Sequence, residues 1–239
     1  DATALNTLDA KTTGTISLSA VSSLTGAASD VVAVYDASAG ISGLDGAEAV
    51  VLTTAASVAD LNAVAAKTTG AVTATVTDTA TNLLGITETS NALTISVTGN
   101  VSATDLVALK AKTTATVTLT EGAVITGTKD EIVTALGTSG IGNLAKVHAT
   151  LTGGSYSVAD INAVDTALDA HSTTFGTITA TVKENDFATL NTLARNGAYT
   201  IELKRTSEFV EGGTALVEKV NAANVNTLNG KTTVPLVVN

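Results

Sequence analysis

Residues 57–77 read Ser57-Val58-Ala59-Asp60-Leu61-Asn62-Ala63-Val64-Ala65-Ala66-Lys67-Thr68-Thr69-Gly70-Ala71-Val72-Thr73-Ala74-Thr75-Val76-Thr77, and this stretch decides the fold. Its apolar residues first recur with helical spacing and so predict a short helix with one apolar side. Ser57 stands three residues before Asp60, which is the pattern of a capping box at a helix start. From Thr73 to Thr77, threonine alternates with apolar residues, which predicts a β-strand with one apolar face. One helix and one strand therefore occupy about twenty residues.

The same pattern returns along the chain, which makes internal repetition the strongest signal in the sequence. Copies of the Leu-Asn-x-Leu-x-Ala-Lys-Thr-Thr motif begin at Leu5, Leu61, Leu106 and Val225, and degenerate copies begin at Ile161 and Leu190. Residues 57–64 also match residues 157–164, at an offset of 100 residues. We therefore predict a single continuous array over residues 1–239, with approximate super-repeats 1–100 and 101–206 and a partial one at 207–239. Insertions at 165–171 and 207–221 blur the later spacing.

Alternation of threonine or serine with aliphatic residues predicts further strands, about nine in all. They are expected at residues 15–19, 48–53, 73–77, 94–98, 116–120, 146–152, 177–181, 199–203 and 234–238. Strands separated by helices imply parallel pairing with right-handed crossovers. Because only one strand face is apolar, the pattern favours an α/β repeat solenoid with one parallel sheet and crossover helices, similar to a leucine-rich-repeat horseshoe. The alternative is a parallel β-helix without helices.

The composition limits the classes of function. The chain has 239 residues, a formal net charge of -10, no cysteine and only 3% aromatic residues, so its core must consist of small aliphatic side chains. No basic stripe of the kind that binds nucleic acid is present, and the densest basic site is Lys204-Arg205. The sequence contains no run of 18 apolar residues, so it predicts no membrane-spanning helix. We therefore expect neither nucleic acid nor a bilayer core as a partner.

Candidate catalytic groups are few. Of the two histidines, His148 lies on a predicted strand and is expected to face solvent, and His171 lies in a polar loop. The pair Asp165 and Asp169 is expected on a solvated helix face, and Asp130-Glu131 in the first turn of a helix. The sequence therefore predicts no catalytic residue and no enzyme, the competing class being a polysaccharide lyase or hydrolase on a β-helix.

Cofactor and contact residues are similarly limited. We expect no cofactor, with a weak calcium site at Asp30, Asp36 or Asp45 as the one alternative, because extracellular acidic repeats often bind this ion. Glycine-rich residues 137–142 recur at 40–43 and are therefore expected to be turns between repeats. The recurring lysine (Lys11, Lys67, Lys112, Lys231) is expected at the carbonyl end of a helix. The recurring asparagine (Asn6, Asn62, Asn162, Asn191, Asn226) is expected to bond to the backbone of loops or of a neighbouring coil.

One feature of the predicted strands favours a role in ligand recognition. The solvent faces of the predicted strands are almost purely threonine and serine, and parallel strands about 4.8 Å apart would form a flat array of hydroxyl and methyl groups. This array is the candidate binding face, for glycan or ice. It consists of Thr73, Thr75, Thr77, Thr94, Ser96, Thr98, Thr116, Thr118, Thr120, Thr177, Thr179 and Thr181.

The motif copies, each followed by a Thr-Val strand, resemble repeats of giant secreted cell-surface proteins of bacteria, in particular the S-layer-like or adhesin-like proteins of cyanobacteria. The resemblance covers essentially the whole chain and transfers no functional residue. It implies an extracellular stalk, sheath, filament or surface-layer lattice at the cell surface, with cell-surface glycan as a candidate partner. The chain opens on a helix-cap pattern at Asp1, so we expect a segment excised from a longer array. Its partners would be neighbouring repeats of the same or identical chains.

Overall fold

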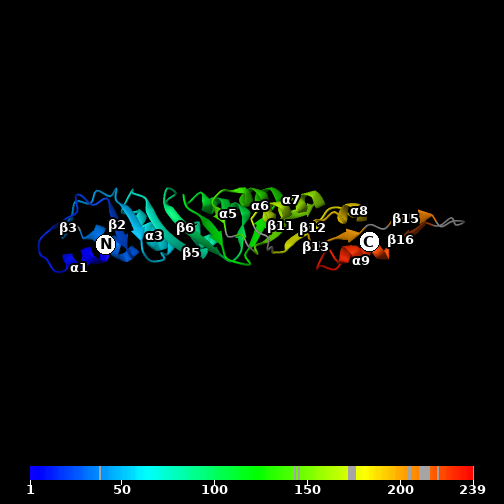
Figure 1. Ribbon diagram of the computed structural model, residues 1–239, viewed down its shortest axis with the longest axis horizontal. Coiled ribbons are helices and arrows are strands. Elements are labelled where there is room, and N and C mark those ends of the chain that lie inside the picture. The colour runs from blue at the N-terminus through cyan, green and yellow to red at the C-terminus, as the bar shows by residue number, and fades with distance from the viewer. Residues whose placement is uncertain are drawn as a thin grey trace. The chain divides into compact units, whose positions relative to one another are not determined.

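A computed structural model describes residues 1–37, 39–142, 144, 146–171, 176–203, 206–209, 216–219 and 221–238. The chain divides into two compact units. Unit 1 comprises Asp1–Asn100, Asp105–Thr120 and Ser139–Asn143, and unit 2 comprises Val101–Thr104, Glu121–Thr138 and Leu144–Asn239. Both units are α/β, with parallel strands and helices between them (Figure 1). The predicted basic site Lys204-Arg205 lies outside the described residues.

Unit 1 has one six-stranded parallel sheet in the order β10-β8-β6-β5-β4-β2, so neighbours in the sheet follow one another along the chain. A separate parallel pair joins β1 to β3. The strands are β1 (Ile16–Ser17), β2 (Ser23–Gly26), β3 (Ile41–Ser42), β4 (Ala49–Leu52), β5 (Val72–Thr79), β6 (Ala92–Thr98), β8 (Val117–Leu119) and β10 (Ile141–Gly142). The helices are α1 (Ala2–Asp9), α2 (Ala28–Asp36), α3 (Val58–Ala65) and α4 (Ala80–Leu83); α5 (Ala103–Lys110) spans the division between the units.

Unit 2 has a five-stranded parallel sheet in the order β13-β12-β11-β9-β7. Its strands are β7 (Val101–Ser102), β9 (Val124–Gly127), β11 (His148–Tyr156), β12 (Ile178–Val182) and β13 (Ala198–Thr200). A parallel pair joins β14 (Glu202–Leu203) to β17 (Val237–Val238), and an antiparallel pair joins β15 (Thr206–Phe209) to β16 (Leu216–Lys219). The helices are α6 (Lys129–Gly137), α7 (Val158–Asp169), α8 (Phe187–Leu190) and α9 (Ala222–Asn229), and α6 lies beside α7 (Figure 1).

The prediction of α/β architecture with parallel strands and intervening helices is confirmed, whereas the prediction of one parallel sheet is wrong. The strands belong to several sheets, and glycine turns follow two of the predicted alternating runs. Gly99 and Gly122 have φ of 74° and 77°, a conformation that glycine adopts without a steric penalty. These turns separate β6 from β7 and β8 from β9, and the two members of each pair join different sheets. The helices between strands also contradict the helix-free alternative.

Apolar residues alternate with polar ones along the strands, and the apolar side chains form the core. In β5 the apolar Val72, Ala74 and Val76 are buried, and the intervening threonines are exposed. The register places Val76 beside Ile95, Ile95 beside Val117, and Val117 beside Ile141, which makes a continuous row of buried aliphatic side chains across unit 1. Small branched side chains fit closely in such a row, which accounts for a core almost without aromatic residues.

The predicted helix starts are present. Ser57 accepts a hydrogen bond from the backbone N–H of Asp60 at 3.1 Å, and Ser157 does the same for Asp160, each within a complete capping box. The predicted insertion at residues 165–171 is largely a longer helix, because α7 continues to Asp169. Asp130 and Glu131 lie in the first turn of α6, as predicted, where Thr128 and Glu131 form a third capping box.

Candidate functional site

In three of the four Lys-Thr-Thr motifs, the first threonine bonds to backbone groups 20 or 33 residues earlier, in or next to a strand. Thr113 is 4% exposed, and its hydroxyl donates to the carbonyl of Leu93 at 2.6 Å while accepting from the N–H of Leu93 at 2.9 Å. Thr232 bonds to both backbone groups of Tyr199 in the same way, at 2.7 and 3.0 Å. Thr68 donates to the carbonyl of Glu48 at 2.6 Å. Each hydroxyl thereby satisfies buried polar groups of the preceding copy.

The lysine of the motif reaches the end of the helix in the preceding copy. Nζ of Lys112 donates to the carbonyl of Ile86 at 2.6 Å, just beyond α4, and Nζ of Lys231 donates to the carbonyl of Leu193 at 2.8 Å, just beyond α8. Lys67 pairs with the carboxylate of Asp36 at the end of α2. A cation near a helix C-terminus is stabilised by the partial negative charge of the unpaired carbonyls. The prediction placed each lysine at the carbonyl end of its own helix, whereas Lys112 and Lys231 bond to loop carbonyls just beyond the preceding helix.

The recurring asparagine makes the complementary contact with the next copy. Asn62 donates through Nδ2 to the carbonyl of Gly85 at 2.9 Å and accepts through Oδ1 from the N–H of Thr87 at 3.1 Å. Asn162 bonds in the same manner to the carbonyl of Thr192 and the N–H of Ala194, both at 2.9 Å. Asn6 donates to the carbonyl of Asp30 at 3.0 Å. The predicted role is confirmed for these three asparagines.

Of the predicted hydroxyl face, nine residues lie on strands and three, Thr116, Thr120 and Thr177, directly flank them; the face falls into two groups, one in each unit. Nine of its residues belong to unit 1, where the register pairs Thr75 with Thr94 and aligns Thr77, Ser96 and Thr118 in one row. Thr177, Thr179 and Thr181 belong to unit 2. Within the face, the exposed residues are Thr73, Thr75, Thr77, Thr94, Thr116, Thr179 and Thr181, and the half-buried ones are Ser96, Thr98, Thr118, Thr120 and Thr177.

The structure adds residues that sequence reasoning did not include in this face. In unit 2 the register aligns Ser102, Thr126, Thr150 and Thr179 in one row. For Thr150 the signal is the alternation in residues 146–152, which predicts the strand that carries it. Thr118 donates weakly to the carbonyl of Ile95 at 3.3 Å, so its hydroxyl also serves the sheet backbone. The hydroxyl row of unit 1 is therefore partly structural.

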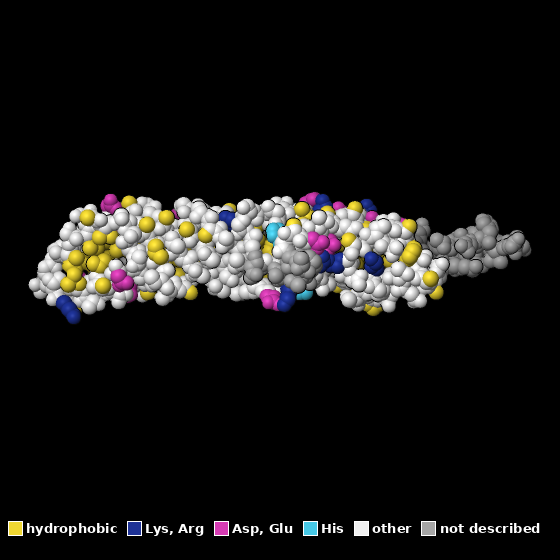
Figure 2. All heavy atoms as spheres, in the orientation of Figure 1, with side chains coloured by type: hydrophobic (Ala, Val, Ile, Leu, Met, Phe, Trp, Pro, Cys, Tyr) yellow, Lys and Arg dark blue, Asp and Glu magenta, His cyan; other side chains and the backbone are white. Residues whose placement is uncertain are grey.

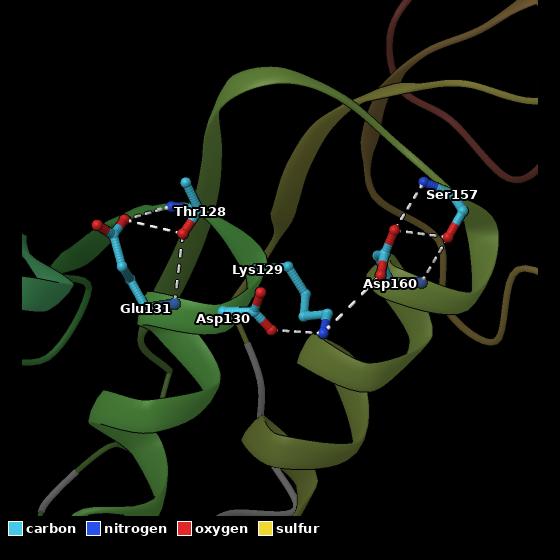
Figure 3. A network of polar contacts seen from close by, with 6 residues as sticks. All are labelled: Thr128, Lys129, Asp130, Glu131, Ser157 and Asp160. Carbon is cyan, nitrogen blue, oxygen red and sulfur yellow. Dashed lines mark hydrogen bonds and ion pairs between the residues drawn. The ribbon is translucent and has the colours of Figure 1, made fainter.

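A further network joins the starts of α6 and α7 in unit 2 (Figure 3). Nζ of Lys129 lies 2.6 Å from the carboxylate of Asp130 and 4.0 Å from that of Asp160. Asp160 also accepts from the hydroxyl of Ser157 at 2.6 Å. These hydrogen bonds and the nearby cation stabilise the ionised carboxylate and lower the pKa of Asp160. The network links the first turns of the two helices and favours the ionised form of Asp160.

The prediction of a solvated helix face is wrong for Asp165 and holds for Asp169, which is exposed. Asp165 is 7% exposed, and both carboxylates pair with the guanidinium of Arg195, which stands on the loop after α8. Burial raises the pKa of Asp165, although the charge of Arg195 opposes the shift. Burial, together with the negative charge of Asp165, raises the pKa of Tyr199 to about 12. Sequence reasoning missed Arg195 because it lies 30 residues from Asp165.

A second buried acid was also missed. Glu48 is 3% exposed and accepts from the backbone N–H of Asp45 at 2.8 Å, from that of Gly46 at 3.1 Å and from the hydroxyl of Tyr35 at 3.0 Å. Burial is the main cause that raises the pKa of Tyr35 to about 12, and the Glu48 carboxylate adds to it. The four groups satisfy one another and fix the turn before β4. A structural role accounts for all of them.

The remaining candidate residues are engaged in ordinary contacts. His148 alternates with the buried Val147 and Ala149 and is half-buried, and its Nδ1 accepts from the N–H of Thr177 at 2.8 Å. Exposed His171 bonds to the carbonyl of Leu136. Asp30 accepts from the hydroxyl of Thr3, Asp36 pairs with Lys67, and Asp45 accepts from the N–H of Ala47. Among the described residues, no three histidine or acidic side chains gather in a possible metal site.

The comparisons with known proteins add no relative. Within the part of the chain that the structure describes, no helix combines the length and apolar character needed to cross a membrane. No protein-family model, curated protein or solved structure matches this chain.

Proposed function

We propose that the chain is a structural repeat segment of a long extracellular surface protein, in which successive Lys-Thr-Thr copies stack as an α/β solenoid. The observation that carries the proposal is the recurrence of the same backbone contacts between successive copies. Threonine and lysine reach back to the preceding copy, as Thr113 and Lys112 do. Asparagine reaches forward to the next, as Asn62 does. A chain whose units bond mainly to their neighbours can lengthen without changing its local fold.

The location at the cell surface rests on the resemblance to secreted bacterial repeats. Such an array suits a stalk, sheath, filament or surface-layer lattice, where the function is to span distance and bear load. The buried polar side chains support a structural role. Glu48 and Thr113 bond to backbone groups, and Asp165 pairs with a neighbouring side chain. No nucleophile, base and orienting group meet among the described residues, so we propose a non-enzymatic role.

Location is tested with antibodies raised against the purified chain. Immunogold electron microscopy of intact source cells should label the outer surface, and brief protease treatment of intact cells should remove the label. Antibody absorbed with the purified chain is the control. Labelling confined to the cell interior of sectioned cells would contradict the proposal. Stacking is tested separately by small-angle X-ray scattering, where a solenoid of all copies requires an elongated particle and a compact sphere would contradict it.

A second candidate function is recognition of glycan or ice by the hydroxyl rows. The register of Thr75 with Thr94, and of Thr77 with Ser96 and Thr118, favours it because it sets hydroxyl groups at regular spacing. Replacing Thr75, Ser96, Thr118 and Thr179 by lysine would remove the rows in both units. Loss of binding on a glycan array, or of ice-growth inhibition, would support recognition if a control bearing lysine at exposed helix positions such as Ala59 and Thr134 kept it. Turnover of any glycan on the panel would instead favour the lyase or hydrolase class.

A further inference from the structure

Two asparagines in the chain are followed directly by glycine, Asn196-Gly197 and Asn229-Gly230. An Asn-Gly pair is prone to spontaneous deamidation, because glycine has no side chain to hinder attack by its own backbone nitrogen on the asparagine amide. Both asparagines are exposed. The two pairs therefore share the same chemistry, and a difference between them depends on how the fold holds the glycine.

The fold encloses the first pair. Gly197 is buried, its N–H donates to the carbonyl of Lys231 at 3.0 Å, and its carbonyl accepts from the N–H of Thr233 at 3.0 Å. A Cβ at Gly197 would lie only 2.5 Å from the ring of Tyr199. With both backbone groups bonded and the ring packed against it, Gly197 has no room to turn its nitrogen toward the amide of Asn196.

The second pair lies at the end of α9, where the glycine is held less firmly. Gly230 is exposed, and its N–H is shared between the carbonyls of Asn226 and Thr227, at 3.3 and 3.2 Å. The N–H of Ala66, at the same motif position after α3, makes a bond of 3.0 Å to its own helix. The last turn of a helix opens more readily than the turns within it. Opening of this turn frees the Gly230 nitrogen to approach the side chain of Asn229.

The fold does not require a glycine at residue 230. Its backbone has the ordinary helical conformation, with φ of -73° and ψ of -16°. A Cβ there would approach the carbonyl of Thr227 at 3.3 Å, and the other complete motif copies have alanine at this position, at residues 10, 66 and 111. Gly230 therefore changes the reactivity of this copy without being needed for its shape.

We propose that Asn229 is a site of spontaneous deamidation. The Gly230 nitrogen loses its proton to hydroxide and attacks Cγ of Asn229; the N–Cγ bond forms, the Cγ–Nδ2 bond breaks, and Nδ2 leaves as ammonia after taking a proton from water. Water then opens the succinimide ring at either carbonyl and yields aspartate or isoaspartate. One water is consumed, one ammonia is released and nothing is oxidised. Figure 2 shows few charged side chains on the surface around α9, so the solvent supplies the base.

The isoaspartate product acts on the contact with the preceding copy. Its backbone passes through Cβ and is one methylene group longer, directly before Lys231 and Thr232. Nζ of Lys231 donates to the carbonyl of Leu193 at 2.8 Å, and the hydroxyl of Thr232 donates to that of Tyr199 at 2.7 Å. A longer backbone displaces both donors, so deamidation weakens this copy with time. The inference does not depend on where the protein is located in the cell.

The first experiment incubates the purified 239-residue chain at mildly alkaline pH and follows both Asn-Gly pairs by peptide mass spectrometry. Asn229 should deamidate about ten-fold or more faster than Asn196, because only its glycine is freed by local opening. In urea the two should react at similar rates. Gly230→Ala should slow the reaction of Asn229 in the folded chain by about ten-fold or more, because a β-carbon restricts the attacking backbone. Circular dichroism should show that this variant keeps the fold.

Two results of that experiment would overturn the site. One is a folded chain in which Asn196 reacts as fast as Asn229. The other is a folded chain in which Asn229 stays intact while the chain in urea reacts, since the helix end would then protect it.

The second experiment tests the consequence of the reaction. The isoaspartate form, separated from aged protein by ion exchange, should unfold at a lower urea concentration than the fresh chain. Asn229→Asp carries the same new charge without the extra methylene group and should unfold close to the fresh chain. Equal midpoints for the isoaspartate form and Asn229→Asp would overturn the effect of the longer backbone on the contacts of Lys231 and Thr232.

Discussion

The hydroxyl of Thr113 holds both backbone groups of Leu93, donating to its carbonyl at 2.6 Å and accepting from its N–H at 2.9 Å. It also accepts the N–H of Ala115 at 3.0 Å. Leu93 belongs to β6, whereas β8 begins only at Val117, after Thr113. The Thr113 side chain therefore bonds the Leu93 backbone in place of a strand partner. The register pairs of β6 and β8 begin at Ile95 and Val117.

Replacing Thr113 by valine tests this contact with nearly no change in volume. The substitution leaves buried N–H and C=O groups unpaired, so we expect a loss of about 2–3 kcal/mol in the free energy of unfolding. Urea denaturation measures it. The matched control is Thr12→Val at the equivalent, exposed position, where water takes over the bond and the change should stay within about 0.5 kcal/mol. Equal effects at the two positions would contradict the structural role.

Asn62→Asp tests the forward contact. The carboxylate can still accept from the N–H of Thr87, but it faces the carbonyl of Gly85 without a donor between them. We expect a loss of about 1–2 kcal/mol at neutral pH. Asn226→Asp, at the same motif position and exposed, is the control and should change stability little. A loss of the same size in both variants would show that helix propensity, and not the contact, is responsible.

Arg195→Met removes the cation that faces the buried Asp165. We expect the variant to lose about 2–3 kcal/mol at pH 7, at the lower end for a broken buried pair because Asp169 and Arg195 reach solvent. The pKa of Asp165, already raised by burial, should rise further. A folded-state pKa above the unfolded value means that the folded protein binds the proton more tightly, so the loss should shrink as pH falls toward 4.

The double variant Arg195→Met with Asp165→Asn supplies the control for that experiment. It has no buried charge, so it should recover much of the stability and lose the pH dependence. Urea denaturation at pH 4 and pH 7 measures both effects. A single variant with the same deficit at both pH values would show that Asp165 does not titrate in the folded state.

The tyrosines report on burial at alkaline pH. Tyr35 and Tyr199 have a pKa of about 12, whereas an unfolded tyrosine ionises near pH 10. Unfolding therefore releases protons between pH 10 and 12, and the free energy of unfolding should fall with pH in this window while remaining unaffected by these groups below it. Tyr35→Phe and Tyr199→Phe should each remove one late step from the ultraviolet titration of tyrosinate. A single step near pH 10 would contradict the burial of both hydroxyls.

The local elements could be read from the sequence because their signals act over a few residues. Ser57 and Ser157 predict helix starts through a hydroxyl that bonds three residues ahead, and both boxes are present. The alternation in residues 73–77 predicts a strand, and β5 contains it. The aliphatic core follows from that alternation, since a strand places successive side chains on opposite faces.

The contacts of the candidate site were predictable only where a motif repeats. Asparagine and lysine at fixed motif positions indicated backbone partners, and Asn62 and Lys112 have them. Arg195 and Glu48 occur outside the motif, so nothing in the pattern indicated that one pairs with Asp165 and the other is buried. The half-buried state of Ser96 and Thr118 also depends on neighbours that the alternation does not specify.

By itself the sequence determined that helices and parallel strands alternate along the chain, which face of strands such as β5 is apolar, and that Ser57 and Ser157 open helices. Only the tertiary structure decided how the strands divide into sheets, which threonines of the Lys-Thr-Thr motif are buried, and that Leu8 is exposed where Leu109 is buried. The physical reason is range. Caps and periodicity depend on neighbours within about four residues, whereas sheet membership and burial depend on which backbone lies alongside, some twenty or more residues away.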